Sequence, residues 1–370
     1  MKEWLKNLPG WHTQRKIVVL AVDDYGNVRL DSQGAYTRLS ERFGEPESRF
    51  DRFDTMETTE DLVSLYETLS SVRDRHGSPA TFTPYTVTLN PDFERMRQCS
   101  CDRVYLEPLV DCWGKLSSRN PDAWGNLADT WREGIESGLM QPQFHGGVHF
   151  NPRAIDNRLA DGDARLLAAL EERSLAMLGA ETTSGPGWTA TFGTSDPDSD
   201  RALLTQLIRE GLDAFQGAFG RSAKCYTPPA HEFSPDLVDI LNDSNLQAID
   251  LPLIQHYKTR NARTKKRLNW TGRRFVKALT TQVRNVIFEP GGSSSATEQA
   301  LRQIDVAFRC RKPAIVSSHR VNFCGHIDPA NRDRGLRELQ KLLKEIVRRW
   351  PSVEFMGADD LQAAMSGVTR

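Results

Sequence analysis

The sequence lacks both a strong excess of charge and a long hydrophobic run. Its 48 lysine and arginine residues nearly balance its 49 aspartate and glutamate residues, which leaves a formal net charge of −1. We therefore expect no overall field that would recruit nucleic acid or a membrane surface. The apolar run nearest the start spans only residues 16–22 and ends in two aspartates, so it fits neither a secretory signal nor a transmembrane helix.

The cysteine spacing of a zinc site is also missing. None of the six cysteines forms a C-x2-C pair, and we expect reduced thiols with structural roles. Together with the lack of a signal-like segment, this predicts a cytoplasmic protein. Internal repeats and low-complexity linkers are lacking as well, so we expect the 370 residues to form one domain.

Strand-like and helix-like patterns alternate along the chain, which is typical of parallel strands covered by helices. Strands are expected at residues 16–22, 80–85, 141–145, 222–226, 246–250, 285–289, 313–318 and 352–356. Helices are expected near 59–76, 121–138, 160–178, 199–217, 234–243, 296–310 and 333–349. The patterns by themselves are compatible with a (β/α) barrel carrying insertions and with an open sheet.

What the sequence does contain is three groups of acidic and histidine side chains at the ends of expected strands. Asp23 and Asp24 directly follow the first expected strand. His145 and His149 follow the third strand, and His319 follows the seventh. Because active sites form at the carboxyl ends of strands in both open sheets and barrels, we expect these five side chains to converge.

This combination of side chains suits metal-dependent hydrolysis. Two imidazoles and one carboxylate leave an open position for water on a zinc-like ion, whereas structural sites are closed. A second carboxylate can then accept a proton from that water. Gly146 and Gly147 each disfavour a helix by about 1 kcal/mol relative to alanine, so the H-x3-H pair is expected on a bend after a strand. The other histidines are expected to be structural, including His231, which follows the Pro228-Pro229 turn.

Four motifs then carry a family resemblance. They are Val22-Asp-Asp-Tyr-Gly26, His145-Gly-Gly-Val-His149, Tyr226-Thr-Pro-Pro229 and Ile315-Val-Ser-Ser-His319. In this order they resemble the first, second, third and fifth motifs of the polysaccharide deacetylases, the NodB-homology carbohydrate esterases. The resemblance implies an α/β fold, the distorted (β/α) barrel of that family. Residues 1–370 would form one deacetylase domain with insertions at about 86–140, 151–220 and 252–284.

The resemblance also implies a role for each motif residue. Asp23 would be the catalytic base and His319 the catalytic acid. Asp24, His145 and His149 would bind a divalent metal ion, with Zn expected and Co, Ni or Mn as alternatives. The ion would lower the pKa of a water molecule and polarise the acetyl carbonyl.

Two departures from the family pattern stand out. The third motif of the family carries an arginine that holds the catalytic aspartate, but this chain has Thr227 at that position. Asp23 would therefore need another cation. The fourth motif supplies an aspartate that tunes the acid histidine, and it has no clear counterpart here. Asp250 and Glu289, each at the end of an expected strand, are both candidates for this role.

Two regions are expected to contact a carbohydrate substrate or its carrier group. Tyr226 and Pro229 lie in the third motif, and Arg320 and Asn322 follow the proposed acid. Residues 258–277 contain nine basic side chains and no acidic one. This segment is either a solvated loop or a contact for a nucleotide-linked or lipid-linked sugar, because both carriers hold phosphate groups.

The sequence therefore predicts a metal-dependent hydrolase that removes an acetyl group from an N-acetylated amino sugar or glycan. One alternative is an amidase or deformylase of the same family that acts on a C–N bond outside polysaccharides. A second alternative is a carbohydrate-binding relative that has lost turnover. The presence of both Asp23 and Asp24 argues against the second alternative, because loss of catalysis often removes the base.

Overall fold

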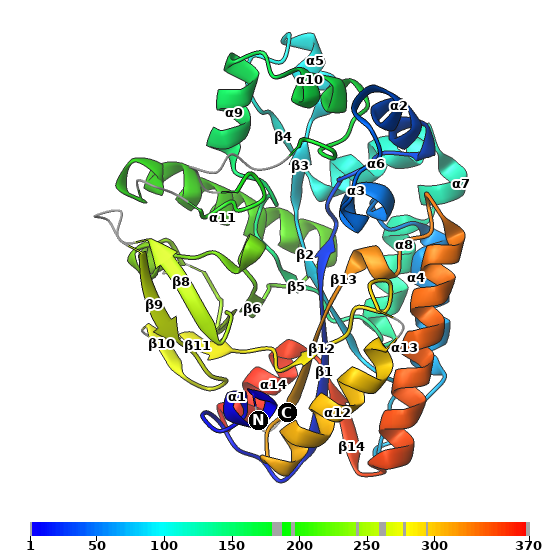
Figure 1. Ribbon diagram of the computed structural model, residues 1–370, viewed down its shortest axis with the longest axis vertical. Helices are drawn as coiled ribbons and strands as arrows, with labels where there is room; N and C mark the ends of the chain where they lie inside the picture. Colours follow the sequence, from blue (N-terminus) through cyan, green and yellow to red (C-terminus); the bar gives the residue numbers. More distant parts are fainter. Residues whose placement is uncertain are drawn as a thin grey trace.

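A ten-stranded sheet forms the centre of the computed structural model (Figure 1). The structure describes residues 2–179, 187–193, 197–241, 244–258, 264–276, 279–293 and 295–367. The strands of the sheet are β1 (Lys16–Tyr25), β2 (Phe82–Thr86), β5 (Gln143–Phe144), β6 (Cys225–Tyr226), β7 (Ala248–Asp250), β10 (Arg274–Val276), β11 (Leu279–Gln282), β12 (Val286–Ile287), β13 (Ala314–His319) and β14 (Val353–Met356).

The order of the strands defines a curled and mostly parallel sheet. It runs β10-β11-β7-β6-β5-β2-β1-β13-β12, with β14 paired to the first half of β1. The recorded pairings are parallel except for the antiparallel edge pair of β10 and β11. In this order β10 and β12 are the two ends, so the described strands form an open half-barrel. The expected α/β fold of the distorted (β/α) barrel type is confirmed.

Strand β1 is the central element because its apolar residues are buried on both faces. Val18 and Val19 are fully buried, and β-branched side chains of this kind suit a buried parallel strand. The last part of β1 pairs with β13 in a register that sets Asp23 opposite His319. The proposed base and the proposed acid therefore stand on neighbouring strands at the same edge of the sheet.

All eight strands expected from the sequence are present, and the described residues form six further strands that were not expected. β10 and β11 belong to the main sheet, and the other four form two separate hairpins. The hairpins pair β3 (Leu89–Pro91) with β4 (Leu106–Pro108) and β8 (Ile254–Lys258) with β9 (Thr264–Leu268). Most of these strands are short or rich in charged residues, so they have no clear hydrophobic period.

Helices cover the outside of the sheet (Figure 1). The α-helices are α1 (Lys2–Lys6), α2 (Gln33–Phe43), α3 (Arg49–Phe53), α4 (Thr59–Ser70), α5 (Phe93–Gln98), α6 (Leu109–Arg119), α7 (Pro121–Trp124), α8 (Leu127–Glu136), α9 (Pro152–Ala160), α10 (Ala164–Glu171), α11 (Pro197–Phe219), α12 (Ala296–Arg309), α13 (Pro329–Arg349) and α14 (Ala358–Met365). The 3-10 helices are η1 (Pro229–His231), η2 (Pro235–Leu241) and η3 (Arg320–Asn322).

Three helix predictions need correction. The expected helix 121–138 is divided into α7 and α8, with Gly125 capping the first. The expected helix 160–178 is much shorter in the structure. Helix α9 ends at Ala160, and α10 covers only Ala164–Glu171. Gly162, with a positive φ of 66°, interrupts the chain between these two helices. The expected helix 234–243 is the 3-10 helix η2 over its described part.

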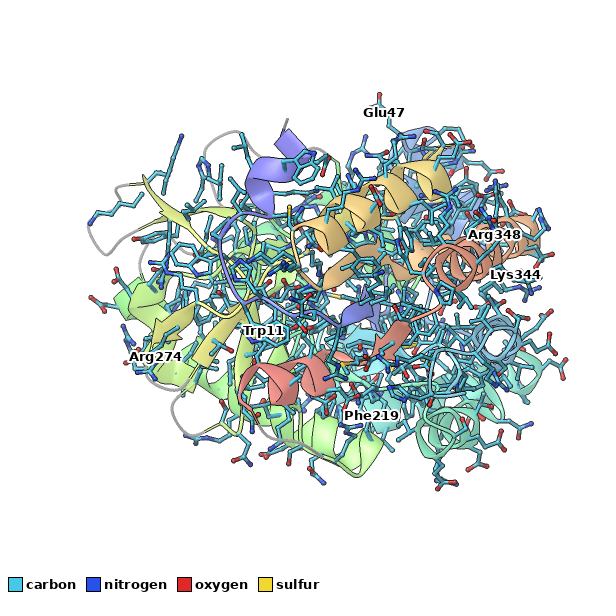
Figure 2. All side chains as sticks on the ribbon, turned by 90° about the horizontal axis from the view of Figure 1, so that it is seen from below. Trp11, Glu47, Phe219, Arg274, Lys344 and Arg348 are labelled. Carbon is cyan, nitrogen blue, oxygen red and sulfur yellow. The ribbon has the colours of Figure 1, made fainter. Side chains whose placement is uncertain are left out.

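Helix α13 shows how the outer layer packs on the sheet. Leu339, Leu343 and Ile346 are buried on its inner face. Lys344 and Arg348 lie at the outer edge of the molecule in Figure 2 and are exposed. This division between an apolar and a charged face is the pattern of an amphipathic surface helix.

The described part of the basic segment 258–277 contains strands. Its described part includes β9 of the β8–β9 hairpin, which lies beside the main sheet (Figure 1). Lys265 and Lys266 are exposed on this hairpin. Arg260, Arg263 and Lys277 lie outside the described residues.

Two further findings concern the cysteines and the membrane. All six cysteines are free, and Cys112, Cys225 and Cys324 are buried, in agreement with reduced structural thiols. Within the described part of the chain, no helix combines the length and apolar character needed to cross a membrane.

Candidate active site

Asp24, His145 and His149 come together at the carboxyl end of the sheet. One carboxylate oxygen of Asp24 lies 3.5 Å from Nε2 of His145 and 3.3 Å from Nε2 of His149. One ligand atom from each residue lies within 4.8 Å of the other two. These oxygen and nitrogen atoms are the donor set of a zinc-like ion with an open position.

The local backbone explains why these side chains converge. Asp24 has a φ of 77°, which is unusual for a non-glycine residue and turns its side chain away from the regular strand direction. Gly146 has a φ of 92°, and a Cβ atom at Gly147 would lie 2.7 Å from the carbonyl oxygen of Leu207. The H-x3-H motif therefore lies on an irregular bend after β5, as the two glycines predicted.

The tautomer of His145 is set by a backbone contact. Its Nδ1 lies 2.7 Å from the carbonyl oxygen of Thr227, and a carbonyl can only accept a hydrogen bond. Nδ1 therefore donates, and Nε2 faces Asp24. That Nε2 atom is buried and has no hydrogen-bond partner among the residues that the structure describes. A buried nitrogen held in this way fits a metal ligand whose second nitrogen is fixed by the protein.

The charges of the three groups also suit a cation. Burial raises the pKa of the Asp24 carboxyl, but His145, His149 and His319 lower it well below its usual value. Burial lowers the pKa of His149 to about 4 against the opposing effect of Asp24. The pKa of His145 is raised, because Asp23 and Asp24 outweigh the effect of burial. At neutral pH the site thus offers an ionised carboxylate and a neutral His149.

Asp23 is held by Arg284, a residue that the sequence did not single out. Nη1 and Nη2 of Arg284 donate to the two carboxylate oxygens of Asp23 at 2.7 and 2.6 Å. Arg284 follows β11 and ends the segment 252–284 that was expected to be an insertion. The cation that the third motif lacks is therefore supplied from elsewhere in the chain. Thr227 also contacts this arginine, because its hydroxyl oxygen accepts a hydrogen bond from Nη2 of Arg284 at 3.2 Å.

Asp250 is the second carboxylate on this arginine. Nε of Arg284 donates to Oδ2 of Asp250 at 2.5 Å, and the Thr227 hydroxyl donates to the same oxygen at 3.1 Å. Burial raises the pKa of the Asp23 carboxyl, but Arg284, His145 and His319 lower it to about 2. Arg284 outweighs burial at Asp250 as well, so its pKa is also lowered. Both carboxyl groups are thus ionised around one buried guanidinium.

His319 is paired with Glu289. Its Nδ1 lies 2.7 Å from Oε1 of Glu289, and Nδ2 of Asn322 donates to the other carboxylate oxygen at 2.6 Å. Burial lowers the pKa of His319, but the hydrogen bond to Glu289 and the charges of Asp24 and Asp23 raise it to about 9. Of the two candidates for tuning the acid, Glu289 is the one that contacts His319, whereas Asp250 contacts Arg284.

The sequence-predicted substrate contacts are not free to meet a substrate. Arg320 is completely buried and forms ion pairs of 3.0 Å with both Asp54 and Glu57. Tyr226 is completely buried among aromatic rings such as Phe144 and Phe233. Neither polar group reaches the surface in this structure, so a direct sugar contact by Arg320 or Tyr226 stays a prediction that the structure does not support.

Asn322 and Pro229 are also buried, and each supports another part of the site. Asn322 holds Glu289 and accepts hydrogen bonds from Arg49 and from the backbone of Gly291. The ring of Pro229 lies against Gly146, where an added Cβ atom would be 3.2 Å from the ring. Neither side chain is exposed for a direct sugar contact in this structure.

No protein-family model and no curated protein matches the chain. A 4-alpha-glucanotransferase from Thermococcus litoralis matches with a TM-score of 0.45 and 9% identity over 94% of this chain, which spans only 40% of that protein. A family 4 acetyl xylan esterase from Clostridium thermocellum, in complex with cobalt, matches with a TM-score of 0.35 and 14% identity over 96% of this chain and 93% of that one.

A CE4 family pseudoenzyme from Bacillus anthracis also matches, with a TM-score of 0.38 and 11% identity over 96% of this chain and 69% of that one. At such identities and TM-scores, these likenesses do not establish a family or an activity for this chain.

Proposed function

We propose that this protein is a metal-dependent hydrolase that removes an acetyl group from an N-acetylated amino sugar. The observation that carries the proposal is the convergence of Asp24, His145 and His149 next to two acid–base groups. Asp23, the chain neighbour of Asp24, pairs with Arg284, and His319, which stands opposite Asp23 in the β1–β13 register, pairs with Glu289. Different side chains would therefore bind the metal, accept a proton and donate a proton.

Asp24, His145 and His149 would hold the divalent ion, with Zn proposed and Co, Ni or Mn as alternatives. A bound ion would lower the pKa of water and polarise the acetyl carbonyl. The buried Nε2 of His145 supports this assignment, because it faces Asp24 and forms no hydrogen bond with any described residue. His149 and His319 are the more accessible side chains, with 13% and 33% of their surface exposed, so the substrate would approach from their side.

Asp23 would accept the proton of the attacking water while the water oxygen bonds to the acetyl carbon. Its two oxygens each accept only one bond from Arg284, and a carboxylate oxygen can accept a second. A pKa of about 2 makes Asp23 a weak base. We therefore propose that it orients the water and carries the proton only briefly.

His319 would donate a proton to the leaving nitrogen as the C–N bond breaks. An amine needs this proton to leave, whereas a stabilised alcoholate does not. The raised pKa of about 9 keeps the imidazole protonated at neutral pH. Glu289, which is itself held by Asn322, fixes the ring, so the remaining nitrogen, Nε2, would face the substrate.

Two parts of the substrate are proposed, the bond that is cleaved and the group that carries the sugar. An amide of an amino sugar is proposed because the site provides an acid for a poor leaving group. A phosphate-bearing carrier, nucleotide or lipid, is proposed because the exposed Lys265 and Lys266 lie on a hairpin that begins at Ile254, shortly after Asp250. Cationic side chains on this hairpin would suit the phosphate groups of the carrier and not the uncharged acetyl group.

The test is acetate release by purified, zinc-loaded protein from a panel of free, nucleotide-linked and lipid-linked N-acetylated amino sugars. Asp23→Asn is the matched control, because it should keep the ion and lose about 10²- to 10⁴-fold in kcat. Release of formate, or opening of a cyclic amide without acetate, would identify the amidase or deformylase instead. Sugar binding without any turnover by the zinc-loaded protein would identify the non-catalytic alternative.

A further inference from the structure

His231 lies on a backbone segment with an unusual conformation next to the site. Ala230 and His231 have φ values of 54° and 53°, so two consecutive non-glycine residues adopt the left-handed region. Non-glycine residues rarely occupy this region, and such outliers gather at functional sites. The conformation bends the chain after Pro229 and directs His231 back toward the end of β7.

The end of β7 presents Asp250 to this histidine. Nε2 of His231 lies 3.8 Å from Oδ2 of Asp250. The same oxygen accepts from Arg284, which in turn holds Asp23. His231 is thus linked to the proposed base through one carboxylate and one guanidinium.

The segment that carries His231 also borders the metal-binding residues. The carbonyl oxygen of Thr227 fixes His145, and Pro229 packs against Gly146. His231 is 32% exposed, close to the 33% of His319 and unlike the 2% of His145. His231 in η1 and His319 at the end of β13 are therefore both about one-third exposed, and each lies beside a carboxylate.

We propose that His231 is a substrate-binding residue that hydrogen-bonds a hydroxyl group of the amino sugar, with Asp250 holding its ring. The proposal rests on the proposed function and adds a binding residue to it. Nε2 of His231 faces Asp250, and no partner of Nδ1 is found among the described residues. That nitrogen can meet a hydroxyl at the rim, while His319 serves the leaving nitrogen. Sugar hydroxyls both donate and accept, so they suit an imidazole of either tautomer.

The experiment compares His231→Ala and His231→Asn with wild type on two substrates. One is a glucosamine disaccharide with both nitrogens acetylated, and the other is p-nitrophenyl acetate, which has no sugar hydroxyl. His76→Ala is the control, because His76 is an exposed histidine that contacts Glu354 near the amino-terminal end of β1, away from the site. Zinc content and melting temperature are measured for each protein.

We expect His231→Ala to raise KM and to lower kcat/KM on the disaccharide by about 10-fold, the size of one hydrogen bond. On p-nitrophenyl acetate the change should stay within about twofold, and His231→Asn should recover part of the loss. Equal losses on both substrates, or an unchanged KM for the disaccharide, would overturn the proposal.

Binding of the same disaccharide to the zinc-loaded proteins, measured by calorimetry, separates this proposal from the proposed function. If wild type binds the disaccharide without hydrolysing it, the deacetylase function fails. In that case about 10-fold weaker binding by His231→Ala still supports the role of His231. Equal binding by both proteins, or no binding by wild type, rejects that role.

Discussion

Arg284 and Asp23 form a bidentate pair across the carboxyl end of the half-barrel, with N···O distances of 2.7 and 2.6 Å. The same guanidinium contacts Asp250 at the end of β7 and the Ser317 hydroxyl of β13. It also lies 5.2 Å above the ring of Tyr85 on β2. One buried side chain therefore ties strands from both halves of the curled sheet to the proposed base.

The first prediction follows from this burial. Arg284→Met removes the buried cation that Asp23 and Asp250 share, so we expect a loss of about 3–5 kcal/mol in the free energy of unfolding. Urea unfolding measures this loss. Arg274→Met, a change at an exposed arginine on the edge strand β10, should stay within about 0.5 kcal/mol. A similar small effect for Arg284→Met would mean that the pair does not stabilise the fold.

The second prediction concerns metal binding. His149→Ala and His145→Ala should each remove most of the bound zinc, because three ligands are needed to hold the ion. Affinity should also fall as the pH drops through the pKa of His145, which is raised above its ordinary value, because a proton then competes with the ion. Equilibrium zinc titrations at several pH values measure both effects. Undiminished zinc in either variant would reject the site.

The third prediction concerns the acid. Glu289 stabilises the protonated His319, so Glu289→Gln should lower the pKa of that imidazole from its raised value. Activity that requires a protonated His319 is lost as the pH rises through this pKa. The alkaline limb of the rate profile should therefore move to lower pH in Glu289→Gln, while zinc content stays unchanged. A profile identical to wild type would show that His319 does not act as the acid.

The fourth prediction separates structure from substrate binding at Arg320. Arg320 lies between Asp54 and Glu57 in the interior, so Arg320→Met should cost about 3–5 kcal/mol of stability through two unpaired buried carboxylates. Below the melting temperature of the variant, KM for the disaccharide should change little. A raised KM with unchanged stability would restore Arg320 as a substrate contact.

Residues with a strong local pattern could be placed from the sequence. β1 was predictable because a run of buried β-branched residues favours a parallel strand, and the two glycines of the H-x3-H motif ruled out a helix. The strand ends then indicated that Asp24, His145 and His149 would meet, and the structure brings them together. The α/β fold class followed from the alternation of strand and helix patterns together with the motif resemblance.

Contacts between distant segments could not be placed in this way. Arg284 follows a short strand without a clear period, and nothing local shows that its guanidinium reaches Asp23, 261 positions away in the chain. The same limit applies to Arg320 and Tyr226. Their polar groups suggest a contact with the substrate in the sequence, and only the tertiary packing shows that both side chains are buried. The choice of Glu289 over Asp250 as the partner of His319 was also decided by the tertiary structure. The local sequence determines where a strand or a bend forms and which side chain stands at its end. The curl of the sheet determines which buried charged groups come into contact, because those groups are far apart in the chain.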